Sequence, residues 1–375
     1  MVSHVAGTRD KERGARAGTT QPRVRGLGST VARYSVGFDP RTVFDFLVSL
    51  STGPKEQAEL PAEDGRWLRD ARAALPADVR AGVFAGGDDR DGIAAEVAAI
   101  AVARPGVTDA AGLVALIETM TPNEIVRALL HRPAQDAGRI EDADIDRALA
   151  GDGERARLVE ERLAPAVGEE TLASVRTMLQ DPVGTAERLH LALRAWLNPF
   201  RGIEGRVREV LERDVAARSG DLHLPPAELV ERTTGGIRFL PDAGIRRVVL
   251  APSYFSRPYN WVIAGEGWRL FCYPVAETAL EAKAGWEPPA ATVLLYRALG
   301  DPQRLRILRM LADRDMYLTE IAQQLELSKP TAKYHLAQLR AAGLVVLTEE
   351  GALTYYTLRR DRVDEAGTEL RRYIS

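Results

Sequence analysis

The chain has 375 residues, too many for one ordinary hydrophobic core, so its length predicts two or three domains. Its composition, 45% hydrophobic and 27% charged, describes a soluble globular protein, and its net charge of -3 excludes nucleic-acid binding driven by overall charge alone. The single cysteine, Cys272, excludes internal disulfides and multi-thiolate metal sites and fits a reducing compartment. Because no apolar run approaches the roughly 18 residues that span a bilayer, and no signal peptide is visible, we expect a cytoplasmic protein.

Residues 1–30 are polar, glycine-rich and basic, with six cations against two acids. This composition is typical of a disordered tail. A solvated extension or a misplaced start codon is one interpretation, and contact with DNA phosphate, as made by other basic arms, is the alternative.

Within residues 31–287 the sequence pattern changes twice, from a strand to helices and then to β-rich runs. A strand in "ARYSVGF" is followed by helical periodicity in "PRTVFDFLVSL", "TPNEIVRALL" and "TAERLHLALRAWL". Short runs rich in β-branched and aromatic residues then follow in "GIRFL", "RRVVLAP", "NWVIAG" and "WRLFCYPV", with "GEG" as a hairpin turn between the last two. We therefore predict an α+β fold, with a large, mostly helical N-terminal domain that carries a small antiparallel sheet.

The densest aromatic cluster of the chain lies in these β-rich runs. Aromatic side chains with an interleaved arginine could line a pocket for a flat or anionic small molecule. The alternative is that they pave the core side of a half-buried sheet. The residues of this candidate effector pocket are Tyr254, Phe255, Arg257, Tyr259 and Trp261.

The sequence does not support catalysis or a bound cofactor. None of the five histidines forms a zinc pattern, and Glu187 with His190 makes only a lone E-x-x-H, which di-iron bundles use in duplicate. The G-x-S-x-G elbow, the P-loop and the G-x-G-x-x-G loop are all absent. We expect no enzyme, no metal site and no cofactor.

Residues 288–375 have the pattern of a winged helix-turn-helix. Asp301 and Pro302 start one helix, and Ser328 caps "KPTAKYHLAQLRAA" shortly after the helical "LTEIAQQL". Gly343 ends the second helix. "LVVLT" and "ALTYYTL" then alternate as the strands of a wing around "EEG". This segment is the predicted DNA-binding domain.

The second of these helices has the face expected of a recognition helix. Ala332, Leu336 and Leu339 form its buried stripe, and no acid occurs between Leu327 and Thr348. Cations beside hydrogen-bonding side chains suit a helix in the major groove. The candidate DNA-binding residues of the helix are Lys329, Thr331, Lys333, Tyr334, His335, Gln338 and Arg340.

The segments "YRALGDPQRLRILRML", "LTEIAQQLELSKPTAKYHLAQLRAAGLV" and "GALTYYTL" resemble the ArsR family of winged-helix transcriptional regulators, in order and spacing. The resemblance covers the last quarter of the chain. It implies that the recognition-helix positions which contact DNA are Ser328, Lys329, Thr331, Lys333 and Tyr334, and that Tyr355 and Tyr356 lie in the wing and are further candidate DNA-binding residues. Two departures stand out. "MYLTEIA" lacks the cysteines with which founding members sense metal, and Glu349 with Glu350 replaces the usual arginine of the wing tip.

The resemblance also implies a homodimer, because helix-turn-helix proteins bind paired half-sites. The last helix carries an apolar stripe, which we expect to pack with apolar residues on the first helix of the DNA-binding domain in the dimer interface. The alternative is that the apolar residues of these two helices complete the core of a monomer. The candidate interface residues are Leu294, Leu295, Leu299, Val363, Ala366, Leu370 and Tyr373.

The N-terminal domain looks like the uncharacterised domain fused upstream of ArsR-type modules in actinobacterial and related regulators, on the segment "GIRFLPDAGIRRVVLAPSYFSRPYNWVIAGEGWRLFCYPV". This likeness implies a sensing or dimer-shaping role. We therefore expect a transcriptional regulator of double-stranded DNA, by family analogy a repressor, with a small-molecule effector at the N-terminal domain. The rivals are an enzyme with an appended winged helix and a winged-helix module that docks on another protein.

Overall fold

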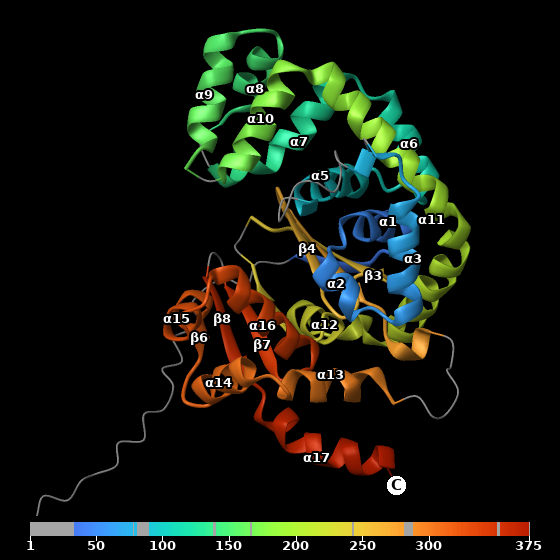
Figure 1. Ribbon diagram of the computed structural model, residues 1–375, viewed down its shortest axis with the longest axis vertical. Helices are drawn as coiled ribbons and strands as arrows, with labels where there is room; N and C mark the ends of the chain where they lie inside the picture. The colour runs from blue at the N-terminus through green and yellow to red at the C-terminus, as the bar shows by residue number, and fades with distance from the viewer. Residues whose placement is uncertain are drawn as a thin grey trace, which may run out of the picture. The chain divides into compact units, whose positions relative to one another are not determined.

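The computed structural model describes residues 34–77, 79–80, 90–137, 140–165, 167–241, 244–280, 288–350 and 353–374 (Figure 1). The predicted basic tail, residues 1–30, lies outside the described residues. The described residues belong to one compact unit. The large helical N-terminal region and the mixed use of helices and strands confirm the predicted α+β class.

The first sheet consists of four strands in the order β1 (Ser35–Phe38), β3 (Arg247–Ser253), β5 (Trp268–Pro274) and β4 (Trp261–Gly265). β4 and β5 pair antiparallel, and the left-handed backbone of Gly267 makes the turn between them, as the sequence predicted. β1 with β3 and β3 with β5 are parallel. The prediction of an antiparallel sheet is therefore wrong for these two pairings, which join segments that no hairpin connects.

Two helices pack directly on β3. All residues of α1 (Thr42–Ser51) are buried, including the polar side chains of Asp45 and Ser49. α11 (Pro182–Arg218) buries one side, including Leu189, Leu193 and Leu197. The remaining helices of this part are α2 (Pro54–Glu59), α3 (Ala62–Ala73), α5 (Arg90–Ala103), α6 (Ala110–Thr119), α12 (Pro226–Thr233) and the short 3-10 segments η1 (Ser219–His223) and η2 (Glu277–Ala279).

Four helices share a second, smaller core in the N-terminal region. Its buried side chains include Val126, Ile145, Leu163 and Leu179. Asp144 holds Arg155 and Arg162 in ion pairs on the outside of this core. The helices are α7 (Pro122–Ala137), α8 (Asp142–Leu149), α9 (Gly153–Leu163) and α10 (Glu169–Gln180).

A buried carboxylate lies where α1 meets the first sheet. The Asp45 side chain is fully buried, and its Oδ1 accepts hydrogen bonds from the Ser253 hydroxyl and, at 3.2 Å, from the Phe255 amide. Its Oδ2 is buried without a hydrogen-bond partner. Burial raises the pKa of Asp45 from 3.8 to about 6, and the two hydrogen bonds oppose this rise only in part.

The Asp45 carboxyl should make stability depend on pH. The folded state binds the proton of this carboxyl more tightly than the unfolded chain does. The resulting contribution to the free energy of unfolding is therefore fully present below pH 3.8 and is lost as pH rises through about 6. Wild type should therefore lose up to ~3 kcal/mol relative to Asp45→Asn between pH 4 and pH 7.5. Urea unfolding of both proteins at several pH values measures this difference. Asp70→Asn, at an exposed position of α3, is the control, and equal pH profiles for all three proteins would contradict the prediction.

The C-terminal region has a core of its own. Leu295, Ile307, Ile321, Leu336 and Tyr356 meet there from four helices and one strand. The elements are α13 (Ala290–Leu299), α14 (Pro302–Leu311), β6 (Met316–Tyr317), α15 (Leu318–Gln324), α16 (Lys329–Ala341), β7 (Val345–Glu350), β8 (Leu353–Leu358) and α17 (Arg360–Ile374).

The wing belongs to a second four-stranded sheet, in which β2 (Ile237–Leu240) is followed by β7, β8 and β6. β7 and β8 form the predicted antiparallel hairpin. β2, which comes from the N-terminal region, pairs in parallel with β7, so that Ile237 lies opposite Leu347. The "GIRFL" run was predicted to belong to the N-terminal sheet, and this assignment is wrong. The backbone of the two regions is thus hydrogen-bonded into one sheet.

Candidate nucleic-acid interface

α15 and α16 form a helix-turn-helix. Glu326 adopts a left-handed conformation in the turn, with φ of +55°. The Ser328 hydroxyl then accepts a hydrogen bond from the Thr331 amide at 3.2 Å and caps α16. The recognition helix therefore begins at the residue expected from the sequence.

The first half of α16 is open to solvent. Ser328, Lys329, Thr331 and Lys333 are all exposed. Their two ammonium groups and the polar tip of Thr331 could reach phosphate and base edges, which is what the N-terminal part of a recognition helix does in a major groove.

The second half of α16 is covered by the N-terminal region. Gln338 is only 4% exposed and Arg340 only 7%. The Gln338 amide nitrogen donates to Glu59 Oε1 at 2.9 Å, and it also contacts the hydroxyls of Tyr259 and Tyr334. DNA therefore cannot reach Gln338 or Arg340 in this structure. The prediction that these two side chains face the groove is wrong, because both lie between the N-terminal region and α16.

Arg340 is a buried cation. Its Nη1 donates to the Thr234 carbonyl at 3.2 Å, and none of the acids that the structure describes lies within ion-pairing distance. Burial lowers the pKa of Arg340, against the weaker opposing influence of Tyr356 and Glu349. Its place in the last turn of α16 suits the cation, because the carbonyl end of a helix attracts positive charge.

Four other predicted contact residues are less accessible than expected. Tyr334 is half-buried, and its hydroxyl donates to Glu59 Oε1 at 3.5 Å. Tyr356 is 5% exposed and part of the C-terminal core, and burial raises its pKa to about 12, so it is corrected to a packing residue. His335 is half-buried, with its Nδ1 3.9 Å from Asp301 Oδ1, and burial lowers its pKa, which disfavours the charged imidazolium that would attract phosphate. Tyr355 is half-buried and packs edge-on against Tyr317.

Sequence reasoning missed Glu59 and Thr234, which cover α16. Glu59 ends α2, and its Oε2 accepts from the Arg297 guanidinium at 3.0 Å. A second ion pair between the regions joins Arg359 to Glu231 at 3.5 Å. No local pattern marks these acids among the many others of the chain, because the contacts arise only from the fold.

The candidate effector residues are mostly enclosed. Tyr254 and Phe255 are buried, and the Tyr254 hydroxyl donates to Asp64 Oδ1 at 2.7 Å. Arg257 donates to Asp64 Oδ2 at 2.6 Å, and its guanidinium lies over the Tyr254 ring at 4.1 Å. The charge and the hydroxyl expected to bind a ligand are therefore satisfied inside the protein. Tyr259 contacts Gln338, and Trp261 packs at the edge of the N-terminal core.

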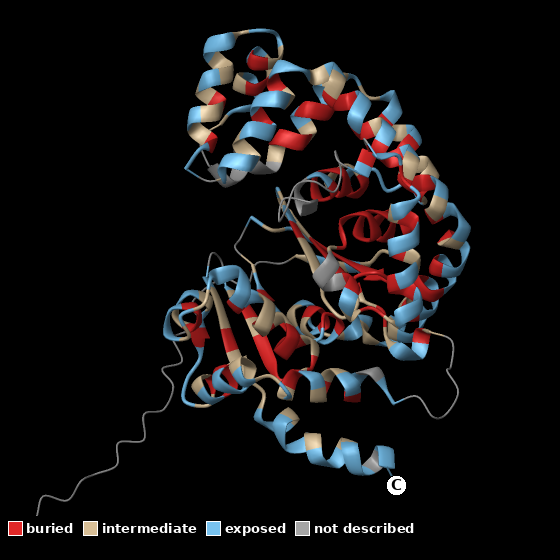
Figure 2. Ribbon diagram, viewed as in Figure 1, coloured by how far each residue is buried: buried red, intermediate tan, exposed pale blue. Residues whose placement is uncertain are grey.

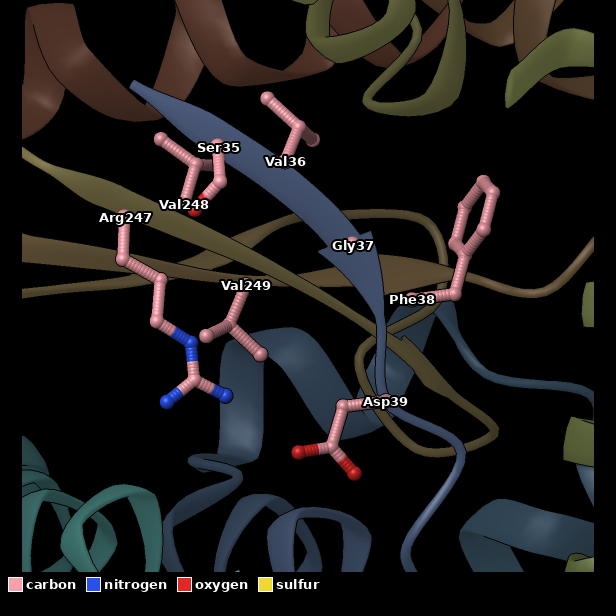
Figure 3. A pocket seen from close by; sticks show the side chains of 8 residues that line it. All are labelled: Ser35, Val36, Gly37, Phe38, Asp39, Arg247, Val248 and Val249. Atoms are coloured by element: carbon pink, nitrogen blue, oxygen red, sulfur yellow. The ribbon is translucent and has the colours of Figure 1, made fainter.

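A shallow pocket opens elsewhere, along β1 and the start of β3 (Figure 3). The candidate effector residues do not line it. Its charged side chains are Asp39, which is held by Arg41, and the exposed Arg247. This pocket is therefore not the aromatic effector pocket that the sequence predicted.

The candidate dimer residues divide into two groups. Leu295 is buried in the C-terminal core, and Leu299 and Ala366 pack against it, while Leu294 is half-buried. The Tyr296 hydroxyl donates to the Ala366 carbonyl at 2.8 Å, which ties α17 to α13. The three that remain exposed, on the largely exposed α17 (Figure 2), are Val363, Leu370 and Tyr373.

The described residues lack both a metal-binding cluster and a membrane-spanning helix. They contain no group of three or more histidine, cysteine or acidic residues that could hold a metal ion. Among the helices described, none is long and apolar enough to cross a membrane.

A helix-turn-helix followed by a two-stranded hairpin, with exposed lysines on its second helix, defines a winged helix-turn-helix DNA-binding domain. Residues 301–346 match the family described as bacterial regulatory proteins of the arsR family. The chain belongs to this family.

Three relatives agree with this assignment. An uncharacterized HTH-type transcriptional regulator of Methanocaldococcus jannaschii is 39% identical over 72 residues, which are 19% of this chain and 81% of the relative. The transcriptional activator HlyU of Vibrio cholerae is 39% identical over 74 residues, 20% of this chain and 68% of the relative. The transcriptional repressor SdpR of Bacillus subtilis is 34% identical over 64 residues, 17% of this chain and 71% of the relative. The C-terminal region is thus that of a DNA-binding transcriptional regulator, and these matches leave the N-terminal region uncovered.

Proposed function

We propose that the protein binds an operator in the cytoplasm as a homodimer, with the first half of each α16 in the major groove. The observation that carries this proposal is the exposed, acid-free start of the recognition helix. Ser328 fixes its first turn, and Lys329, Thr331 and Lys333 project into solvent. The domain limits that we propose are residues 31–287 for the N-terminal domain and residues 288–375 for the DNA-binding domain.

We propose a regulatory role, without a reaction, for the N-terminal domain. Pairing between β2 and β7 gives it a direct mechanical connection to the wing. An effector that binds two arrangements of this joint with different affinity would change the affinity for DNA. Repression is our proposal for the direction, by resemblance to the family, whose relatives named above include one activator and one repressor.

Binding to the region upstream of the protein's own gene tests this proposal. Wild type should bind that duplex more tightly than a scrambled duplex of equal length, and its affinity should fall steeply between about 50 and 200 mM salt, as expected when lysines displace phosphate counterions. Fluorescence anisotropy at several salt concentrations measures both effects. Equal, weak binding to both duplexes by a folded protein would count against an autogenous operator. DNA selected for binding from a random library is the further test. Equal, weak binding to the selected duplex and to the scrambled duplex would overturn the proposed function.

A further inference from the structure

We propose that Glu59 holds the recognition helix in a closed state that binds DNA weakly, so that release of this carboxylate is the step that activates DNA binding. This inference rests on the proposed function. We call the contact of Glu59 with Arg297, Tyr334 and Gln338 the Glu59 clamp. It joins one side chain of the N-terminal region to α13 and α16 of the winged helix-turn-helix domain.

The clamp is built from directional contacts. Glu59 Oε1 accepts from the Gln338 amide at 2.9 Å and from the Tyr334 hydroxyl at 3.5 Å, and Glu59 Oε2 accepts from Arg297 at 3.0 Å. The Glu59 side chain is 14% exposed, whereas that of Arg297 is 55% exposed. A carboxylate that accepts hydrogen bonds from three donors is a strong acceptor, and its enclosure protects it from screening by salt.

The position of the clamp explains why the closed state should disfavour DNA. Tyr334 and Gln338 are one turn apart on α16 and therefore lie on the same face. That face is turned toward Glu59 and Tyr259. The side chains left open to a groove are those at the start of the helix, Lys329, Thr331 and Lys333. A negative carboxylate placed beside this face would also repel approaching phosphate.

The opposite role for the same contact would be that of a brace, which preorganises α16 for DNA. A brace and a clamp predict opposite changes when the carboxylate is removed. The brace predicts weaker binding because the helix loses support. The clamp predicts tighter binding because the apparent affinity rises with the fraction of molecules in the open state.

Glu59→Ala is the test, with Glu63→Gln as the matched control. Glu63 lies nearby at the start of α3 and is exposed, and its ion pair is with Arg206 of the N-terminal region, so its loss removes the same charge without touching α16. Glu59→Ala should bind the selected duplex about tenfold more tightly than wild type, since hydrogen bonds to a charged group are lost from the closed state only. Glu63→Gln should match wild type.

A second measurement keeps the clamp separate from the DNA-binding proposal. Without DNA, Glu59→Ala should increase hydrogen exchange of the backbone amides in α16 at least about fivefold over Glu63→Gln, because opening exposes the helix. Unchanged exchange would overturn the clamp, and so would unchanged or weaker binding by Glu59→Ala to a duplex that wild type prefers. If exchange rises but no variant prefers any duplex, Glu59 still closes over α16, whereas the operator-binding function fails and the activation step fails with it.

Discussion

Replacing Lys329 and Lys333 together by alanine is expected to weaken binding to the operator about 100-fold at near-physiological salt. Both side chains are exposed on the first half of α16, the part of the helix that the N-terminal region leaves open. In a dimer the change removes four cations from the groove. The slope of log affinity against log salt should therefore become shallower by roughly 3 to 4.

Anisotropy titrations at several salt concentrations measure both the affinity and the slope. The control is Arg208→Ala with Arg213→Ala, because both arginines are exposed on α11 in the N-terminal region and the net charge changes equally. This control should keep the affinity and slope of wild type. Wild-type affinity in the lysine variant would move the DNA-binding surface away from α16, and equal losses in both variants would mean that only overall charge matters.

The boundaries of the recognition helix could be predicted from the sequence because its signals are local. Asp301 caps α14 by accepting from the amides of Gln303 and Arg304, and Ser328 caps α16. The capping residue, the proline of the first turn and the apolar stripe all lie within the short segment that forms the helix. Such signals identify an element without any knowledge of the rest of the fold.

The pairing of the strands could not be predicted in the same way. Val36 lies opposite Val248, and Ile237 lies opposite Leu347, so the parallel partners are far apart in the chain. Alternation of apolar residues shows that a strand has a buried face but does not identify its neighbour. Hairpins are the exception, because the turn itself brings the partners together, and both predicted hairpins are present.

The division of α16 into an open and a covered half depends on the same kind of distant contact. Periodicity placed Gln338 away from the stripe of Ala332, Leu336 and Leu339, and that placement suggested solvent or DNA. The actual neighbour is Glu59, in a helix near the other end of the chain. A polar residue that faces away from its own domain's core can thus face a second domain, and no local pattern distinguishes the two cases.

Changing Leu370 to glutamate is expected to convert the proposed homodimer to a monomer and to weaken operator binding about 100-fold or more. Leu370 is 39% exposed on α17, in line with the exposed Val363 and Tyr373, and exposed apolar stripes of this kind mark protein–protein contact sites. A charge inside such an interface has no partner, so its desolvation opposes association. A monomer holds one half-site only and loses the avidity that links the two.

Sedimentation equilibrium at micromolar concentration, followed by titration with a duplex of one or two half-sites, tests this prediction. Arg371→Gln is the control, because it changes the net charge by the same amount at an exposed position beside the stripe. The control should remain dimeric and bind the full operator as wild type does. Leu370→Glu should bind the single half-site as weakly as wild type does, because α16 itself is unchanged. A Leu370→Glu dimer with full affinity would mean that α17 is not the interface and that the copies meet through another surface.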